Sequence, residues 1–270
     1  MRTPQALRNR PWLEPAARAG YVAKGIIYAL IGGLAIAQVV ESAGSIGGGR
    51  NAVQTIGQQP FGQILLVIIG VGLFAYALWR AVQAIFDPED AQSDTGGTLK
   101  RIGYGASGAV HAMLGVAAFQ MALGSGGGGS SKKTYLAELL AIDTIGPVLV
   151  VGLGLFVIGF AVYQLYKAAT LKFQEELKTG EMSRSLRKWV PKLGRFALAS
   201  RGVVFAIVGV FLVKAGLDSN PGEFEGVGGA LREIGSESFG SILLVLVATG
   251  LAAYGAFQVV MARYRKIPAR

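Results

Sequence analysis

The chain has 270 residues, of which 52% are hydrophobic, 16% are charged and 40 are glycine, and its formal net charge is +10. A soluble domain normally carries about 25% charged residues, so the composition excludes an ordinary water-soluble globule. The sequence contains no cysteine, which excludes a disulfide framework, thiol catalysis and cysteine-based metal or iron–sulfur sites.

Six apolar segments follow one another along the chain, each as long as the ~20 residues that a helix needs to cross a bilayer. Their apolar residues surround the helix instead of forming one stripe, which is typical of membrane spans. The first segment is expected to remain as a signal anchor, because no convincing small-residue cleavage pattern follows it. We expect spans over residues 20–41, 61–85, 102–123, 145–168, 196–217 and 239–262.

Lysine and arginine are distributed unequally between the two sides of these spans. Segments on one side contain 21 of them and segments on the other side contain 5. Because positive loops stay cytoplasmic, the sequence predicts a multi-pass protein of the bacterial inner (plasma) membrane with both termini in the cytoplasm. No basic domain with groove-reading or aromatic elements is present, so we expect no nucleic-acid partner.

One pattern occurs three times with constant internal spacing. An arginine, a glycine, a ring-bearing residue and a second glycine open each copy, and an apolar residue followed by glycine opens its second helix. The positions are Arg18, Gly25, Tyr28, Gly32 and Phe61-Gly62; Arg101, Gly108, His111, Gly115 and Ile145-Gly146; Arg195, Gly202, Phe205, Gly209 and Phe239-Gly240. The repeated unit is therefore a two-span hairpin.

Hairpins with an even number of spans all enter the membrane in the same sense, and such repeats are related by an axis along the membrane normal. The predicted fold class is all-α: a polytopic membrane protein with six transmembrane helices as three parallel helical-hairpin repeats in a six-helix bundle with pseudo-threefold symmetry. Small residues four apart on each first helix, such as Gly25, Ala29 and Gly33, are expected to let helix backbones approach closely.

The predicted organisation has five parts: a cytoplasmic segment 1–17, repeats at 18–86, 100–170 and 193–262, and a cytoplasmic tail 263–270. Each outer connection is expected to include a short interfacial helix, at 52–56, 136–140 and 230–234. The inner connection 171–192 ends in basic residues and Trp189, which favours a surface helix lying on anionic lipid; a partner-docking motif is the alternative.

The repeats resemble a bacterial family of integral membrane proteins catalogued as domain of unknown function 1206, whose members have three tandem two-helix modules. The resemblance rests on Gly20-Tyr21 through Gly25, on the IGQQPFG segment at 56–62 and on the Tyr76 and Trp79 pair, and it covers nearly the whole chain. The second copy departs from the pattern, with Pro147 after Gly146. The family has no established activity, so the resemblance supports the architecture and supplies no catalytic residues.

Lys24 and Arg201 occupy equivalent positions six residues after a repeated arginine, where the third copy of the position is Ser107. They are candidate contacts for anionic lipid headgroups or for another anion, and snorkelling of the long side chains toward the interface is the alternative. His111 is the only histidine, and its equivalence to Tyr28 and Phe205 favours a ring that fills a helix contact over a proton relay or metal ligand.

Gln38, Gln120 and Lys214 lie near the outer ends of the three first helices and are candidates to line an outer vestibule. The predicted spans lack aspartate and glutamate near their centres, and no nucleophile–base pair, cofactor fingerprint or metal-ligand set is found. We therefore predict a noncatalytic scaffold, accessory or lipid-interacting protein without cofactor or metal. Its expected partners are membrane lipids, anionic lipids among them, and a membrane protein or a second copy. The alternative is a passive channel or small-solute transporter along the pseudo-threefold axis.

Overall fold

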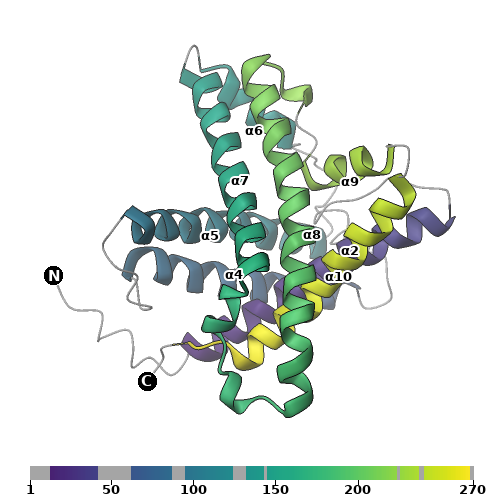
Figure 1. The fold of residues 1–270 in the computed structure, drawn as a ribbon. Helices are drawn as coiled ribbons and strands as arrows, with labels where there is room; N and C mark the ends of the chain where they lie inside the picture. Colours follow the sequence, from purple (N-terminus) through teal and green to yellow (C-terminus); the bar gives the residue numbers. More distant parts are fainter. Residues whose placement is uncertain are drawn as a thin grey trace.

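The computed structural model describes residues 13–41, 62–86, 95–123, 132–142, 145–223, 226–236 and 240–267, which are almost entirely helical (Figure 1). Six long helices coincide with the predicted spans: α2 (Leu13–Glu41), α4 (Gly62–Phe86), α5 (Thr95–Ala122), α7 (Ile145–Thr170), α8 (Arg184–Leu217) and α10 (Gly240–Tyr264). Within the described residues, five of them are long and apolar enough to cross a membrane, namely α4, α5, α7, α8 and α10. The sixth span, within α2, stays a prediction.

Short helices occupy parts of the connections. Two of the three predicted outer helices are confirmed, as α6 (Lys132–Leu140) and α9 (Gly226–Ser236), and the third, at 52–56, lies outside the described residues. Three 3₁₀ turns complete the connections: η1 (Lys172–Glu176), η2 (Thr179–Glu181) and η3 (Pro221–Glu223).

The basic end of the inner connection is not the separate surface helix that the sequence predicts. Ser183 caps α8, its hydroxyl accepting from the backbone N–H of Leu186 at 3.3 Å, and the helix then runs without interruption to Leu217. Pro191 does not end the helix. The basic residues and the exposed Trp189 therefore belong to the first turns of a long helix that continues into the fifth predicted span.

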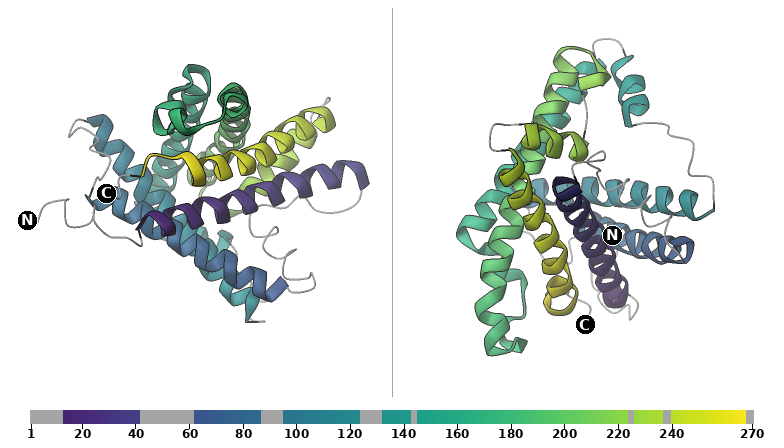
Figure 2. Two further views of the ribbon diagram at one scale, coloured as in Figure 1. Left: turned by 90° about the horizontal axis from the view of Figure 1, so that it is seen from below. Right: turned by 90° about the vertical axis from the view of Figure 1, so that its right-hand side faces the viewer.

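The long helices form three pairs that run in clearly different directions (Figures 1 and 2). The most extensive contacts are those of α4 with α5, α7 with α8, and α10 with α2. Each pair thus joins the second helix of one repeat to the first helix of the next, and the last repeat closes onto the first. Sequential hairpin partners pack less extensively, as in α2 with α4 and α8 with α10.

The first repeated glycine sets this pairing between repeats. A Cβ atom at Gly25 would lie 2.8 Å from the carbonyl oxygen of Gly255 on α10. At the equivalent Gly108 and Gly202, a Cβ atom would lie 3.3 Å from the carbonyl oxygens of Ala77 on α4 and Ala161 on α7, respectively. The three acceptors are themselves equivalent in the repeats, so the same backbone approach occurs three times in cyclic order.

The second repeated glycine makes the next contact along the same interface. Gly32 lies against Ala248 and Ala252 of α10, so a Cβ atom there would be 2.6 Å from the backbone nitrogen of Ala252. A Cβ atom at Gly33 would have no neighbour within 4 Å. The predicted contact role is therefore wrong for Gly33, because the helix turns that residue away from α10.

The repeated arginine caps the end of the neighbouring helix. Arg101 donates from Nε to the carbonyl of Ala84 at 2.8 Å and from Nη2 to that of Ile85 at 2.9 Å, in the last turn of α4. Arg195 makes the equivalent bonds to Ala168 and Ala169 of α7, and Arg18 to Ala262 and Arg263 of α10. Carbonyls at a helix C-terminus lack partners within the helix, and a cation there is favoured by the helix dipole.

The second repeat departs from the symmetry, because its own helices α5 and α7 scarcely contact each other within the described residues. In the first repeat, Gly72 of α4 lies so close to Ala23 of α2 that a Cβ atom would be 2.6 Å from the alanine Cβ. In the third repeat, Gly250 of α10 likewise lies against Ser200 of α8. The equivalent residue of α7 is Phe156, whose ring is too large for this approach.

Two ion pairs of one carboxylate hold the end of α10 against the inner connection. Glu176 in η1 forms ion pairs with Lys167 at the end of α7 and with the buried Arg265 just after α10. Burial by itself would raise the pKa of the Glu176 carboxyl, but the two cations outweigh it and lower that pKa from 4.5 to about 2. Leu177 and Arg265 add an antiparallel bridge between the two segments.

The adjacent glycines of α2 provide a matched test of the pairing. Gly32→Ala is expected to lower the free energy of unfolding by about 1–3 kcal/mol, because the methyl group would overlap the α10 backbone. Gly33→Ala places the same group in open space and is expected to raise stability by up to about 1 kcal/mol through helix propensity. Unfolding of the purified protein in mild detergent measures both, and equal effects of the two substitutions would contradict the α10–α2 contact.

Candidate functional site

A cluster of cations and rings lies where the three helix pairs meet. We call it the central cluster, and it receives side chains from all six long helices. Its members are Lys24 and Tyr28 of α2, Tyr76 and Arg80 of α4, His111 of α5, Phe160 of α7, Arg201 and Phe205 of α8, and Tyr254 of α10. Both predicted anion-contact residues, Lys24 and Arg201, therefore belong to one site.

Lys24 and Arg201 are buried, with 3% and 6% of their surfaces exposed. The snorkelling alternative does not describe them, because neither side chain reaches the surface of the chain. Their location follows from the helix pairing. The repeated glycines bring α2 against α10 and α8 against α7, and the residues just before Gly25 and Gly202 then point toward the centre.

Tyr76 holds two of the cations. Its hydroxyl oxygen accepts from Lys24 Nζ at 2.9 Å and from Arg80 Nε and Nη2 at 2.8 and 2.6 Å. The Lys24 ammonium also lies 4.7 Å from the centre of the Tyr76 ring and 5.6 Å from that of Tyr254, and the Arg80 guanidinium lies 4.9 Å from that of Tyr104. Contacts with ring faces partly replace the water that a buried cation loses.

Arg201 is enclosed by aromatic rings. Its Nε donates to the Tyr28 hydroxyl at 3.0 Å. Its guanidinium carbon lies 4.7 Å from the centre of the Phe205 ring, 4.8 Å from that of Tyr254 and 5.1 Å from that of Phe160. Arginine suits this environment because its planar group is weakly hydrated and stacks on rings.

The rings themselves follow the threefold repeat. Tyr28 packs on Tyr254 at 4.7 Å between ring centres, His111 on Tyr76 at 4.6 Å, and Phe205 on Phe160 at 5.6 Å. Each pair again links the first helix of one repeat to the second helix of the preceding one. The prediction that His111 fills a ring position at a helix contact is confirmed, and its Nδ1 lies 2.7 Å from the carbonyl oxygen of Ser107.

The charges of the cluster do not balance. Lys24, Arg80 and Arg201 contribute three cations, whereas the buried residues of the described segments include no aspartate or glutamate. The polar acceptors that these side chains meet are the two tyrosine hydroxyls and the side-chain oxygen of Gln83, and none of them is a carboxylate. Burial of a charge without an opposite charge is costly, so an anion at this place would be stabilising.

The residues predicted for an outer vestibule do not form a site in the described part of the chain. Gln38 belongs to the end of α2, and its side chain lies outside what the structure describes; Gln120 is exposed on α5. Lys214 is exposed on α8 and lines an open pocket of about 440 Å³ beside η3 and α9. The vestibule stays a prediction.

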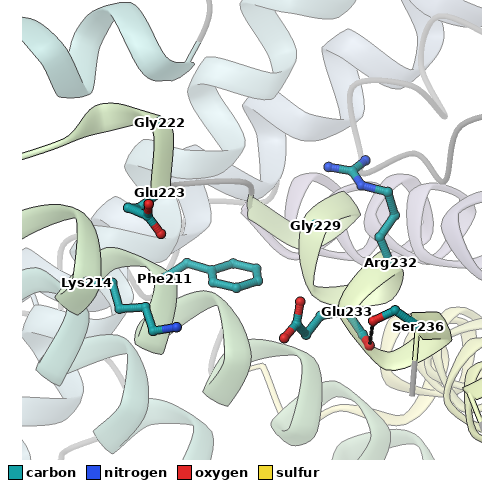
Figure 3. A pocket seen from close by; sticks show the side chains of 8 residues that line it. All are labelled: Phe211, Lys214, Gly222, Glu223, Gly229, Arg232, Glu233 and Ser236. Atoms are coloured by element: carbon teal, nitrogen blue, oxygen red, sulfur yellow. Dashed lines mark hydrogen bonds between the residues drawn. The ribbon is translucent and has the colours of Figure 1, made fainter. Parts of the chain in front are cut away.

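That pocket carries charges of both signs (Figure 3). Lys214 of α8, Glu223 of η3 and Glu233 of α9 border the same space, and the Arg232 side chain points away from it. Lys214 follows Arg201 by 13 residues on one helix, which is about 20 Å at 1.5 Å per residue. The pocket is therefore separate from the central cluster. Within the described residues, no group of three or more histidine, cysteine, aspartate or glutamate side chains could hold a metal ion.

The sequence singled out Lys24, Arg201 and His111 but did not predict that they form one cluster with Arg80 and the aromatic residues. Tyr76, Phe160 and Tyr254 are visible as equivalent positions in the three repeats. The sequence therefore contained a signal for the cluster. Cations at one repeated position and rings at another predict cation–π contacts, provided that the pairing of the helices is known. That pairing crosses from one repeat to the next, and hairpin order alone points to the wrong partner.

Removal of one hydroxyl tests the arrangement around Tyr76. Tyr76→Phe is expected to lower the free energy of unfolding by about 1–3 kcal/mol, because Lys24 and Arg80 lose their shared acceptor. In a Lys24→Met background the same substitution should cost less, since only one cation remains to be satisfied. Unfolding in mild detergent measures both costs, with the half-exposed Tyr163→Phe as control. Equal costs in the two backgrounds would contradict a shared acceptor.

The comparisons with known proteins agree with the repeat pattern. The family described as Domain of Unknown Function (DUF1206) matches three tandem segments, 19–87, 102–170 and 196–265. An uncharacterised protein of Bacillus subtilis (strain 168), YxxB, is 32% identical over 257 residues, covering 95% of this chain and 93% of the relative. No solved structure matches the chain. Three copies of the family's segment and a relative aligned over nearly its whole length show that the chain belongs to the DUF1206 family.

Proposed function

We propose that this protein is a noncatalytic integral membrane protein that acts as a scaffold, accessory or lipid-interacting component. The observation that carries the proposal is the central cluster, in which all six long helices meet through rings and cations. The polar atoms there bond to one another and to ring faces, an arrangement suited to holding helices together and to attracting an anionic partner. Anionic lipid is a partner of that kind, and it is present at the membrane surface.

We also propose the bacterial inner (plasma) membrane as its location, with both termini in the cytoplasm. The distribution of lysine and arginine supports this orientation. The three arginine caps support a common sense of the repeats, because Arg18, Arg101 and Arg195 cap equivalent helix ends. Repeats that present the same end in this way enter the membrane in the same sense.

The absence of cysteine makes the orientation directly measurable. We expect Asp218→Cys, at the end of α8, to react with a membrane-impermeant maleimide in intact spheroplasts. Gly180→Cys, in the inner connection, should react only after permeabilisation. Both residues are exposed and lie outside the long helices, so each substitution leaves the packing unchanged. The reverse labelling pattern would contradict the proposed orientation.

A passive channel along the pseudo-threefold axis is the competing function. The rings of the central cluster occupy the region where the helix pairs meet, and the pocket beside α9 lies at the far end of α8 from Arg201. We therefore expect proteoliposomes to release trapped small solutes and ions no faster than protein-free liposomes. Selective solute flux that rises with the amount of protein would contradict the proposed scaffold function and favour the channel.

A further inference from the structure

Two features of the molecule are left unexplained by helix packing. The first is the surplus of positive charge in the central cluster. Lys24 and Arg201 each donate one hydrogen bond to a tyrosine hydroxyl, although an ammonium carries three donors and a guanidinium five. Two buried cations therefore retain donor capacity, and an oxyanion is the chemical group that would use it.

The second feature is the open side of the second repeat, which we call the α5–α7 seam. In the apolar spans of α5 and α7, 22% of the span is buried inside the molecule. The buried share is 56% for α4 and 50% for both α8 and α10. Gly103 of α5 has no neighbour within 4 Å of a hypothetical Cβ atom, whereas the equivalent Gly20 lies against Tyr76. By this equivalence we expect Gly103 to face the seam, and Phe156 of α7 stands where α4 and α10 have the contact glycines Gly72 and Gly250.

The two helices that border the seam also contribute to the cluster. His111 of α5 packs on the Tyr76 ring, and Phe160 of α7 packs on the Arg201 guanidinium. In the other two repeats the hairpin helices, α2 with α4 and α8 with α10, also pack on each other along their length. Exposed apolar residues accompany the seam helices, including Val110 and Met113 on α5 and Leu155 and Val162 on α7.

We propose that the α5–α7 seam binds one anionic phospholipid, with its phosphate directed to Lys24 and Arg201 and its acyl chains along α5 and α7. The depth of Lys24 in the membrane fits a lipid headgroup. Lys24 follows the cap residue Arg18 by six residues, which is about 9 Å along the helix axis. If the helix is tilted, the distance along the membrane normal is shorter. Charge complementarity favours an anion, and the exposed apolar residues of α5 and α7 favour a lipid over a soluble anion. This inference rests on the proposed lipid-interacting function and names its ligand.

Native mass spectrometry of the full chain in mild detergent tests the site, with added dioleoyl-phosphatidylglycerol or dioleoyl-phosphatidylcholine. We expect one phosphatidylglycerol per chain, bound at least about tenfold more tightly than phosphatidylcholine. The double substitution Lys24→Gln with Arg201→Gln should abolish that preference, since the loss of one charge-assisted bond corresponds to about tenfold or more in affinity. Lys214→Gln, on the same helix as Arg201 but exposed in the outer pocket, should leave the preference unchanged.

A second variant keeps every cation in place. Gly103→Phe fills the seam where the structure leaves open space, so the chain should fold and bind phosphatidylglycerol at least about tenfold more weakly if a lipid occupies the seam. Gly33→Phe adds the same ring at an open position on α2 and should have no effect on lipid binding. Thermal unfolding of each variant shows that it is folded before lipid is added.

Three outcomes would overturn the proposal. Equal binding of the two lipids would show that charge does not select the ligand. Undiminished binding in Gly103→Phe would remove the seam as the location. Displacement of phosphatidylglycerol by inorganic phosphate at equal concentration would replace the lipid with a soluble anion. Solute flux, measured separately in liposomes, decides between scaffold and channel, so failure of the lipid site is distinguishable from failure of the proposed function.

Discussion

The close approach of each first helix to the second helix of the preceding repeat is the contact on which the rest of the structure depends. Gly25, Gly108 and Gly202 have no side chain to separate the backbones, so a carbonyl oxygen of the neighbouring helix occupies the space. Water cannot drive helices together inside a bilayer, and small residues provide the contact area instead. The arginine caps then fix the register, because each guanidinium reaches only the last turn of its partner helix.

This pairing explains why charges occur at the centre of an otherwise apolar molecule. The residue before each repeated glycine is carried inward together with it, and in two of three copies that residue is a cation. The repeated rings follow one turn later and supply the π faces and hydroxyl oxygens that hold those cations. The cluster is therefore a product of the fold's symmetry combined with substitutions that break it.

The broken symmetry is concentrated in the second repeat. Ser107 replaces a cation there, His111 and Phe160 replace tyrosines found in other copies, and Phe156 stands where the other repeats have glycine. The last change coincides with the loss of packing between α5 and α7, whereas glycine at this position lies against the hairpin partner in the other two repeats. Within the described residues, the second repeat is therefore the one whose own two helices do not pack together.

The sequence by itself determined the helical class, the repeat and the six segments, because length, hydropathy and spacing are local properties of the chain. It also predicted that His111 fills a helix contact and that Lys24 and Arg201 occupy equivalent positions in their repeats. Only the tertiary structure decided which helices pair, since a repeat pattern is identical whether a first helix packs on its own partner or on that of the preceding copy. That choice separated Gly32 from Gly33 and joined Lys24 to Tyr76 and Arg201 to Tyr28. These are contacts between residues far apart in the chain, and their geometry depends on the shape of every helix between them.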